Sequence, residues 1–368
     1  MVAPGDLYVR DSVIAAPAKF VSGMEMFAAK FPGEVHLLGR PASVPDSDNL
    51  GAQALPIDEL DFECHVTSDL AAALRSLDPD VALLSLSEDH ASLIGIAGAS
   101  VVAAEHAARS WLAMSLADEH SLLDRARMEV GYRRLERRLT RVVESADGLH
   151  CNGVVAWTSY GSHSPDAIRV YDSRVTSTVV ERAKATRKPW SGGLLRLGFS
   201  GRLTSIKGPQ YVVGLPALLG ERGIAATVDV FGDGPMRKEL EASGSAVRFH
   251  GTLDYEREWC PYIAENIDLM VLPHVQPDPS GTYFESAGVG VPVLGFQHET
   301  TRDLARHGWV FASEQRSAAS LADSIAHLVG DTASLQAASA AGFGFMQTRT
   351  FEMDFGRRVE HLVRVMSI

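Results

Sequence analysis

Two cations in the second half of the chain follow a run of apolar residues that is typical of a strand. The run 195–200 ends at Gly201, and Arg202 and Lys207 lie in the loop that precedes an expected helix. Arginine offers a planar fork of donors and lysine a mobile point charge, so together they could neutralise a diphosphate leaving group without a metal ion. The alternative is an ordinary basic loop, because short loops often carry two cations and bind nothing.

A second polar segment follows another buried run, which ends at Pro273. The next helix is expected to begin near Thr282. Ser280, Gly281 and Thr282 would then present unpaired backbone N–H groups, a natural seat for phosphate. Glu285 is expected on the first turn, where its carboxylate could accept hydrogen bonds from two vicinal ribose hydroxyls. The alternative is an acid favoured there by the helix macrodipole, with no ligand.

A third segment combines two glycines and an acid directly after an expected strand. Gly232, Asp233 and Gly234 follow the run 227–231, and Pro235 stands where the first helical residue is expected. A tight glycine turn lets a ligand approach the backbone closely. For this turn alone, a purely structural connection between strand and helix is the favoured interpretation.

Polar side chains also follow two expected strands of the first half. Glu105 and His106 come directly after the run 101–104, and Glu88 and His90 come after the strand before it. The carboxyl ends of parallel strands form the edge at which such sheets bind ligands. We therefore expect His106 in an active site and Glu88, His90 and Glu105 near a bound substrate. The alternative for His106 is a histidine that merely follows a strand.

These residues need a scaffold whose strands end at a common edge. Short β-branched runs alternate with longer segments of helical period, which is typical of parallel sheets covered by helices on both faces. The expected strands are 7–14, 35–38, 81–85, 101–104, 148–151, 168–171, 195–200, 227–231, 247–250, 269–272 and 293–295, with helices at 19–30 and 113–146. We predict an α/β protein with two Rossmann-like, doubly wound domains that face each other across a cleft.

A polar segment is expected to separate the two halves. Residues 181–193 combine charges, Pro189 and two adjacent glycines, which suggests an interdomain linker. The predicted domains are residues 1–175 and residues 176–350. A final helix within residues 351–368 is expected to pack back toward the first domain.

The overall composition argues against several classes of protein. At 368 residues, with 46% hydrophobic and 22% charged residues, the chain can form two ordinary cores. A net charge of −12 argues against a protein that coats nucleic acid, which needs an excess of Lys and Arg. The three cysteines are odd in number and far apart, so they predict neither a zinc cluster nor a disulfide framework. They favour a reducing cytoplasm, as does the lack of a signal-peptide pattern at the first residues.

Two further patterns favour ordinary structure over function. Asp78, Pro79 and Asp80 form an Asp-x-Asp pattern that could bind a metal, but the pattern precedes a strand, so a turn is expected. No metal site is predicted. The arginine-rich stretch around Arg133 and Arg137 is interleaved with glutamates, which predicts a solvated helix face. A helix lying on an anionic membrane is the alternative.

Taken together, these segments of the second half resemble the donor domain of the retaining family 4 glycosyltransferases, which have the glycosyltransferase B fold. Four signals occur in the family's order: Gly201-Arg202 with Lys207-Gly208, then Gly232 to Pro235, then Val247 to Gly251, and finally Asp268 through Glu285 to Val293. The resemblance is close over roughly residues 195–295 and covers the first half in architecture only. It implies that residues 176–350 form a donor domain and residues 1–175 an acceptor domain, in which Glu88, His90 and Glu105 are the acceptor candidates.

The resemblance implies a retaining enzyme that moves a hexose-type sugar from a UDP-sugar or GDP-sugar to an acceptor hydroxyl, with no metal or other cofactor. It implies that Arg202 and Lys207 bind the donor diphosphate, Glu285 binds the ribose and the base lies near Gly251. His106 would match an active-site histidine of relatives. The expected donor site comprises Gly201, Arg202, Lys207, Gly232, Asp233, Gly234, Gly251, Ser280, Gly281, Thr282 and Glu285.

One departure from the family pattern bears on catalysis. Family members carry two glutamates with seven residues between them, but the position that would pair with Glu285 holds Pro277. Asp278 is one position away. Either a shortened loop lets Asp278 contact the sugar, or this contact is missing. The expected catalytic residues are accordingly His106, Asp278 and Glu285.

The missing glutamate supports a rival interpretation, a glycosyltransferase-like binding subunit or coupling enzyme without normal transfer. A dinucleotide-dependent dehydrogenase would need a Gly-x-Gly-x-x-Gly turn after its first strand, and neither half has one. An epimerase or phosphorylase of the same fold stays open. The expected partners are a nucleotide-sugar donor and a small-molecule, glycan or lipid-linked acceptor, and no nucleic acid. The sequence leaves open both homo-oligomers and membrane association.

Overall fold

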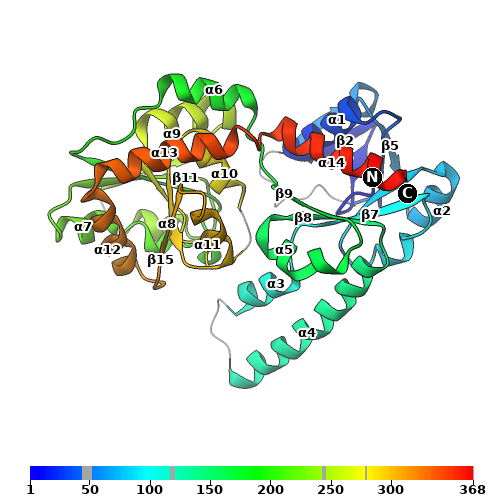
Figure 1. Ribbon diagram of the computed structural model, residues 1–368, viewed down its shortest axis with the longest axis horizontal. Helices are drawn as coiled ribbons and strands as arrows, with labels where there is room; N and C mark the ends of the chain where they lie inside the picture. Colours follow the sequence, from blue (N-terminus) through cyan, green and yellow to red (C-terminus); the bar gives the residue numbers. More distant parts are fainter. Residues whose placement is uncertain (44–51, 117–120, 243–245, 278–279, 368) are drawn as a thin grey trace. The chain divides into compact units, whose positions relative to one another are not determined.

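The computed structural model describes residues 1–43, 52–116, 121–242, 246–277 and 280–367 (Figure 1). The chain divides into two compact units. The first comprises Met1–Ala108, Glu129–Tyr171 and Glu352–Ile368, and the second comprises Arg109–Met128 and Asp172–Phe351. Each unit has its own parallel sheet.

The second unit contains a six-stranded parallel sheet. Its strands are β10 (Leu195–Ser200), β11 (Ala226–Phe231), β12 (Val247–Gly251), β13 (Leu269–Val271), β14 (Val293–Phe296) and β15 (Val310–Ser313). They lie in the order β12-β11-β10-β13-β14-β15, and neighbouring strands are parallel. The chain thus moves outward from β10 to β12 and then returns to build the other half from β13. The strand order reverses between β10 and β13.

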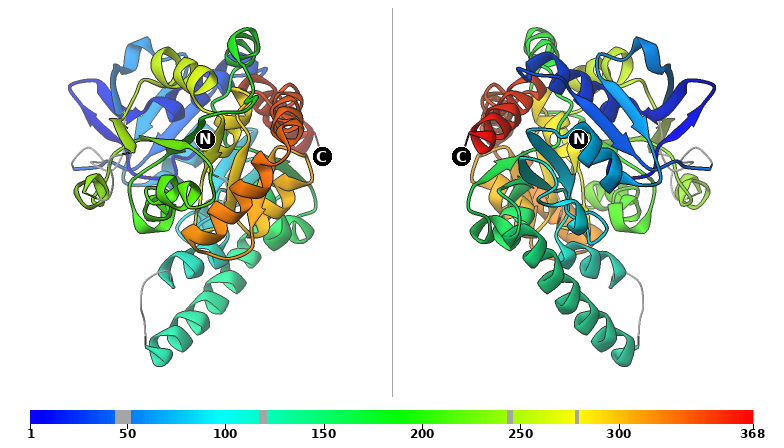
Figure 2. Two further views of the ribbon diagram at one scale, coloured as in Figure 1. Left: turned by 90° about the vertical axis from the view of Figure 1, so that its left-hand side faces the viewer. Right: turned by 90° about the vertical axis from the view of Figure 1, so that its right-hand side faces the viewer.

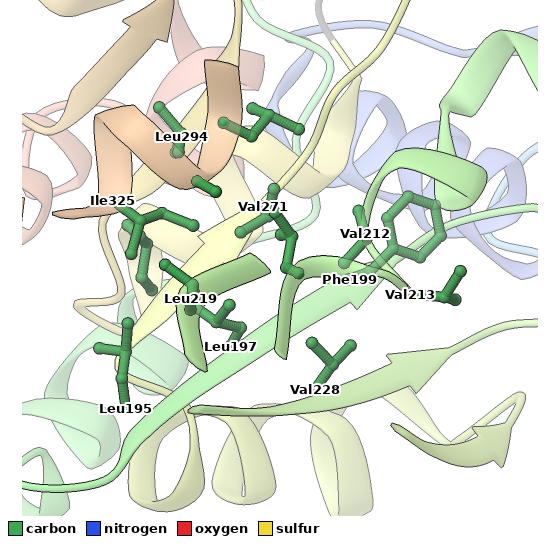
Figure 3. Packing of buried hydrophobic residues seen from close by; sticks show 14 of the residues in the cluster. Leu195, Leu197, Phe199, Val212, Val213, Leu219, Val228, Val271, Leu294 and Ile325 are labelled. Atoms are coloured by element: carbon green, nitrogen blue, oxygen red, sulfur yellow. The ribbon is translucent and has the colours of Figure 1, made fainter. Parts of the chain in front are cut away.

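Helices cover both faces of this sheet. They are α6 (Ser177–Thr186), α7 (Leu215–Gly220), α8 (Arg237–Glu241), α9 (Cys260–Asn266), α10 (Gly281–Gly288), α11 (Glu299–Ala305), α12 (Ala318–Val329) and α13 (Thr332–Met346). Figure 1 shows α6, α9 and α13 on one face and α7 and α12 on the other. Leu197, Val271 and Leu294 come from three strands and lie in one fully buried cluster with Leu219 of α7 and Ile325 of α12 (Figure 3).

The first unit has a four-stranded parallel sheet that a short bridge extends. Strands β6 (Val81–Ser85), β7 (Ala99–Ala104), β8 (Gly148–Asn152) and β9 (Ala167–Val170) lie side by side in that order. Strands β3 (His36–Gly39) and β5 (Glu63–Val66) form a second parallel pair. Val2 connects the two groups, because it bridges Leu38 in parallel and donates its N–H to Leu83 at 3.0 Å. The predicted α/β architecture is confirmed.

The prediction of one strand over residues 7–14 is wrong. The segment is a hairpin of β1 (Tyr8–Arg10) and β2 (Val13–Pro17), turned by Asp11 and Ser12 at φ values of 51° and 62°. Short polar residues tolerate this left-handed backbone, which the tight hairpin turn requires. The hairpin pairs with β4 (Ala52–Pro56) to form a separate sheet at the margin of the first unit, in dark blue in Figure 2.

Two expected helical boundaries also differ. The stretch 113–146 forms two helices, α3 (Ala108–Ser115) and α4 (Leu122–Glu144), instead of one. The segment 181–193 is not an open linker, because α6 continues to Thr186 and the buried Arg187 donates to the carbonyl of Ala264 at 3.1 Å. Glu181 and Arg182 lie on the exposed side of this packed helix, so its surface composition resembles that of a linker.

Helices α1 (Ala18–Lys30), α2 (Leu70–Leu77), α5 (Gly153–Tyr160) and α14 (Phe351–Met366) belong to the first unit, α14 from Glu352 onward. Asp78 ends α2 in a left-handed conformation, so the Asp-x-Asp pattern forms the expected turn. In α4, Arg133 pairs with Glu129 at 3.2 Å, as a solvated helix face would. Among the described residues, none of the helices combines the length and the apolar character needed to cross a membrane.

Candidate functional site

The reversal of strand order brings two loops of the second unit together. The loop after β10 and the loop after β13 leave the same edge of the sheet, where open parallel sheets bind ligands. Val275 donates its N–H to the carbonyl of Ile206 at 2.9 Å, which ties the loops to each other. Gly208 has a φ of 77°, and a Cβ there would lie 2.3 Å from the carbonyl oxygen of Pro273. Glycine is therefore required for this close approach.

The glycine turn after β11 packs against the first of these loops. Leu203 donates its N–H to the carbonyl of Asp233 at 2.9 Å, and Gly232 donates to the carbonyl of Gly251 at 2.7 Å. A Cβ on Gly232, whose φ is 110°, would lie 2.1 Å from the carbonyl oxygen of Gly201. The structure thus brings Gly201, Gly232 and Gly251 to one edge.

Asp233 has local partners for its carboxylate. One oxygen accepts the N–H of Gly234 at 2.7 Å, and the other faces Arg237 at 3.1 Å. Both contacts stabilise the turn itself, so the structural interpretation of this turn accounts for Asp233. Its role and that of Gly234 in donor binding stay predictions.

Arg202 and Lys207 lie on the loop after β10, as expected. Arg202 is exposed, and Lys207 is half-buried at the end of a single 3-10 turn, Ser205–Lys207. The charge of Lys207 is close enough to His274 to help lower the pKa of that imidazole. Lys207 therefore faces the loop after β13, at the point where the strand order reverses.

Sequence reasoning missed His274, which directly follows Pro273. Its side chain is fully buried, and neither ring nitrogen has a hydrogen-bond partner among the described residues. Burial lowers its pKa well below the usual value for histidine, and the charges of Lys207 and His298 lower it further. A neutral histidine with two ring nitrogens that make no hydrogen bond to the described residues therefore lies under this edge. The sequence carried one signal for His274, namely that it is a polar residue soon after a buried run.

The helix that follows the second loop begins one residue earlier than expected. Helix α10 starts at Gly281, with Ser280 as its N-cap and no side chain capping its first N–H groups. A helix leaves its first N–H groups without an internal partner, so Gly281 and Thr282 present such groups here, and their binding of phosphate stays a prediction. Glu285 consequently lies in the second turn instead of the first. The macrodipole acts within the first turn, so it accounts for Glu285 less well.

The carboxylate of Glu285 is buried and held by a residue that the sequence did not reveal. Arg174 donates its Nε–H to Oε1 of Glu285 at 2.7 Å, and its guanidinium lies 3.8 Å from the centroid of the Tyr255 ring. Oε2 of Glu285 accepts no hydrogen bond from the described residues. Arg174 and Glu285 are far apart in sequence and show no spacing pattern, so only the fold connects them.

Asp278 lies outside the described residues, so its expected contact with the sugar stays a prediction. Pro277, which occupies the position of the missing family glutamate, accepts a hydrogen bond from the Thr300 hydroxyl through its carbonyl. The backbone of Pro277 is thus tied to the N-terminal turn of α11.

In the first unit, Glu105 and His106 follow β7 directly. His106 is exposed and Glu105 is half-buried. Asn152, at the end of β8, donates its side-chain N–H to Oε2 of Glu105 at 2.9 Å. His106 therefore stands at the carboxyl edge of the first sheet, where an active-site residue is expected.

Glu88 and His90, the weaker acceptor candidates, both have structural partners. Glu88 pairs with Arg138 of α4 at 3.1 Å. His90 is buried, and its Nδ1 lies 3.3 Å from the carbonyl of Ser85. Burial is the main cause of its lowered pKa. These contacts explain both residues without an acceptor, whose binding by Glu88, His90 and Glu105 stays a prediction.

The second unit matches a family of known proteins. The model of the family described as glycosyl transferases group 1 matches residues 195–331. We refer to residues 195–331 as the group 1 domain, after this match. The resemblance inferred from the sequence is thereby confirmed for this range. The group 1 domain contains all the donor-site candidates from Gly201 to Glu285 and none of the candidates of the first unit.

A curated relative also matches part of this chain. The 2-deoxystreptamine glucosyltransferase of Streptomyces kanamyceticus is 31% identical over 137 residues, which is 36% of this chain and 35% of that enzyme. The matched part of this chain thus spans about a third of that relative's length.

The solved structures cover nearly the whole chain. Anabaena HepE in complex with UDP has a TM-score of 0.62 at 14% identity, covering 95% of this chain and 96% of its own. Sucrose-phosphate synthase from Thermosynechococcus elongatus has a TM-score of 0.64 at 13% identity, covering 93% and 91%. They confirm the predicted glycosyltransferase B fold, within which the group 1 domain is the second Rossmann-like domain.

Proposed function

We propose that this protein is a retaining glycosyltransferase that moves a hexose-type sugar from a nucleotide diphosphate sugar to an acceptor hydroxyl. The observation that best supports this function is the hydrogen bond from Val275 to Ile206, which joins the loops after β10 and β13 where the strand order reverses. The candidate groups for a diphosphate are the cations of the first loop and the start of α10, which follows the second loop.

The donor is proposed to be a UDP-sugar, with a GDP-sugar as the second choice. The fold relative HepE has been solved with UDP and with UDP-glucose. The curated relative that matches 36% of this chain is named a 2-deoxystreptamine glucosyltransferase. Uridine and glucose are therefore the first base and sugar to test.

The proposed chemistry needs no metal, because protein cations and backbone N–H groups stabilise the leaving diphosphate. Arg202 and Lys207 neutralise the charge that develops as the bond between sugar and phosphate breaks. The acceptor oxygen bonds to the same face of the anomeric carbon, and its proton passes to the leaving phosphate. Glu285 holds the ribose, Asp278 holds the sugar hydroxyls, and His106 acts near the reacting carbon or the acceptor.

A second candidate function rests on Pro277. The position of the first family glutamate carries no carboxylate, so the protein could bind the donor as a subunit or coupling enzyme without normal transfer. Asp278 separates the two functions, because it can replace the missing group only if its loop brings it to the sugar.

The test combines binding with turnover. Thermal unfolding is followed with UDP, GDP, ADP and TDP, and the cognate nucleotide should raise the midpoint, because it binds only the folded state. Release of that nucleotide from its glucose conjugate is then measured in EDTA with candidate acceptors. Turnover in EDTA supports the transferase. Stabilisation by a nucleotide without turnover of any sugar donor supports the binding subunit, and strict dependence on added Mg²⁺ or Mn²⁺ contradicts the proposed chemistry.

A further inference from the structure

Three metal-ligating side chains of the first unit gather at one point on its surface. Nδ1 of His36 lies 3.1 Å from Nε2 of His65. One carboxylate oxygen of Glu63 lies 3.3 Å from Nδ1 of His36 and 3.4 Å from Nε2 of His65. Two imidazole nitrogens and a carboxylate oxygen thus form a nearly equilateral triangle.

The backbone register produces this arrangement. Strands β3 and β5 are parallel, and His36 stands directly opposite Glu63. His65 is two residues further along β5, so it projects from the same face of the strand as Glu63. The three side chains therefore share one face of a two-stranded ribbon. The expectation of no metal site did not foresee this cluster, because His36 is distant in sequence from Glu63 and His65.

The triangle has the size of one face of a tetrahedral coordination shell. Bonds of about 2.0–2.1 Å to Zn²⁺ place tetrahedral ligand atoms about 3.3–3.4 Å apart. The observed edges of 3.1, 3.3 and 3.4 Å agree with this spacing. Without a metal, a hydrogen bond between the two imidazoles would explain the short distance between His36 and His65. It would not explain why one oxygen of Glu63 lies almost equally far from both rings.

The surroundings favour a cation. Oε2 of Glu34 lies 3.6 Å from Nε2 of His36, the ring nitrogen that points away from the triangle. Carboxylates in this outer position orient ligating histidines and raise their basicity. Asp58 and Asp61 line the same surface hollow as Glu34, Glu63 and His65, so the local potential is negative.

We propose that His36, Glu63 and His65 bind a divalent transition-metal ion, Zn²⁺ as the first choice, with water completing the tetrahedron. Two imidazoles and one carboxylate suit Zn²⁺ better than Mg²⁺ or Ca²⁺, which prefer oxygen ligands. Because its ligands come from both β3 and β5, the ion links the two strands and stabilises the first unit. The donor-site candidates all belong to the second unit, so this site is distinct from the proposed donor site.

The experiment uses the full chain without an affinity tag. Zn²⁺ is titrated by calorimetry, Co²⁺ replaces it for visible spectroscopy, and thermal unfolding is followed with and without Zn²⁺. The wild type should bind one equivalent, show the intense bands of tetrahedral Co²⁺ and unfold at a higher temperature with Zn²⁺. Loss of an outer carboxylate costs about 10- to 100-fold in metal affinity, so His65→Ala, which removes a ligand, should cost at least as much.

Two variants separate the site from general surface binding. Glu34→Gln should weaken Zn²⁺ binding less than His65→Ala does. The matched control is His163→Ala, because His163 is also exposed and lies 3.2 Å from a glutamate, Glu144, without a second histidine. Equal Zn²⁺ affinity in the wild type and a folded His65→Ala variant would overturn the proposal. So would octahedral Co²⁺ bands, which would mean that the ion is held mainly by water.

Discussion

Arg174 and Glu285 form an ion pair with a 2.7 Å hydrogen bond between Nε and Oε1. The Glu285 side chain is only 9% exposed while that of Arg174 is 45% exposed, and the Arg174 guanidinium lies 3.8 Å from the centroid of the Tyr255 ring. Burial raises the pKa of Tyr255 well above its usual value, so a neutral ring faces the cation. The pair fixes one oxygen of Glu285 and leaves the other for a ligand hydroxyl, which makes Arg174 a positioning residue for the proposed ribose contact.

Arg174→Ala should therefore raise the KM for the sugar donor by about 10-fold, with a smaller change in kcat, because a misplaced hydrogen bond to ribose costs about 1.5 kcal/mol. Arg174→Lys should restore part of the loss. Steady-state kinetics of folded variants measures both. If Arg174→Ala changes stability but leaves KM at the wild-type value, the pair is structural only.

Replacing Arg202 or Lys207 with alanine should weaken binding of the nucleoside diphosphate by about 10- to 100-fold each, the cost of one charge-assisted hydrogen bond. Calorimetric titration with UDP and GDP measures the change. Arg316→Ala and Lys188→Ala serve as controls, because both residues are exposed and lie outside the loops of the site. Unchanged affinity in both folded variants would refute the assignment.

His106→Ala should lower turnover much more than nucleotide affinity, because the proposed role concerns the reacting centre and not the diphosphate. A drop of about 100-fold in kcat is expected for loss of a group that assists proton transfer. The comparison is between kcat of the transfer reaction and the Kd of the nucleotide alone. Wild-type turnover would show that His106 merely follows a strand.

Asp278→Asn should keep binding of the nucleoside diphosphate and lose discrimination for the intact sugar donor, together with most of the transfer rate. The change removes one charge with little change in shape, so an effect on the sugar alone assigns the carboxylate to the sugar hydroxyls. Competition between UDP and UDP-glucose, followed by a transfer assay, gives both readouts. Normal transfer in this variant would mean that the loop works through its backbone.

The free energy of unfolding should fall as pH drops below about 6.5. Burial lowers the pKa of His150, aided by the charges of Arg358 and His361, and burial also lowers the pKa of His361. Below this pH the histidines of the unfolded chain become protonated, while these two imidazoles stay neutral in the folded protein. Each of the two can therefore lower the free energy of unfolding by up to about 1.4 kcal/mol per pH unit. Urea unfolding at pH 8 and pH 5.5 tests this. His150→Gln should reduce the acid sensitivity and the exposed His163→Gln should not; identical pH dependence in all three proteins would contradict it.

The donor-site segments were predictable because their signals are local. A buried strand followed by Gly201, or by Gly232 and Gly234, marks a turn whose backbone only glycine adopts easily. The same local rule failed at residues 7–14, where the left-handed turn uses Asp11 and Ser12 in place of glycine. It also failed at 181–193, because an amphipathic helix on a packed surface has the composition of a linker.

By itself, the sequence determined the alternation of strands and helices, and the order of turns, cations and helix start that marks the group 1 domain. These features depend on neighbouring residues, so their period and spacing are legible along the chain. Only the tertiary structure decided that Arg174 holds Glu285, that His274 lies buried beside Lys207, and that His36 stands opposite Glu63. The reason is physical: such contacts depend on strand register and on loops crossing a sheet edge, which join residues that no local pattern connects.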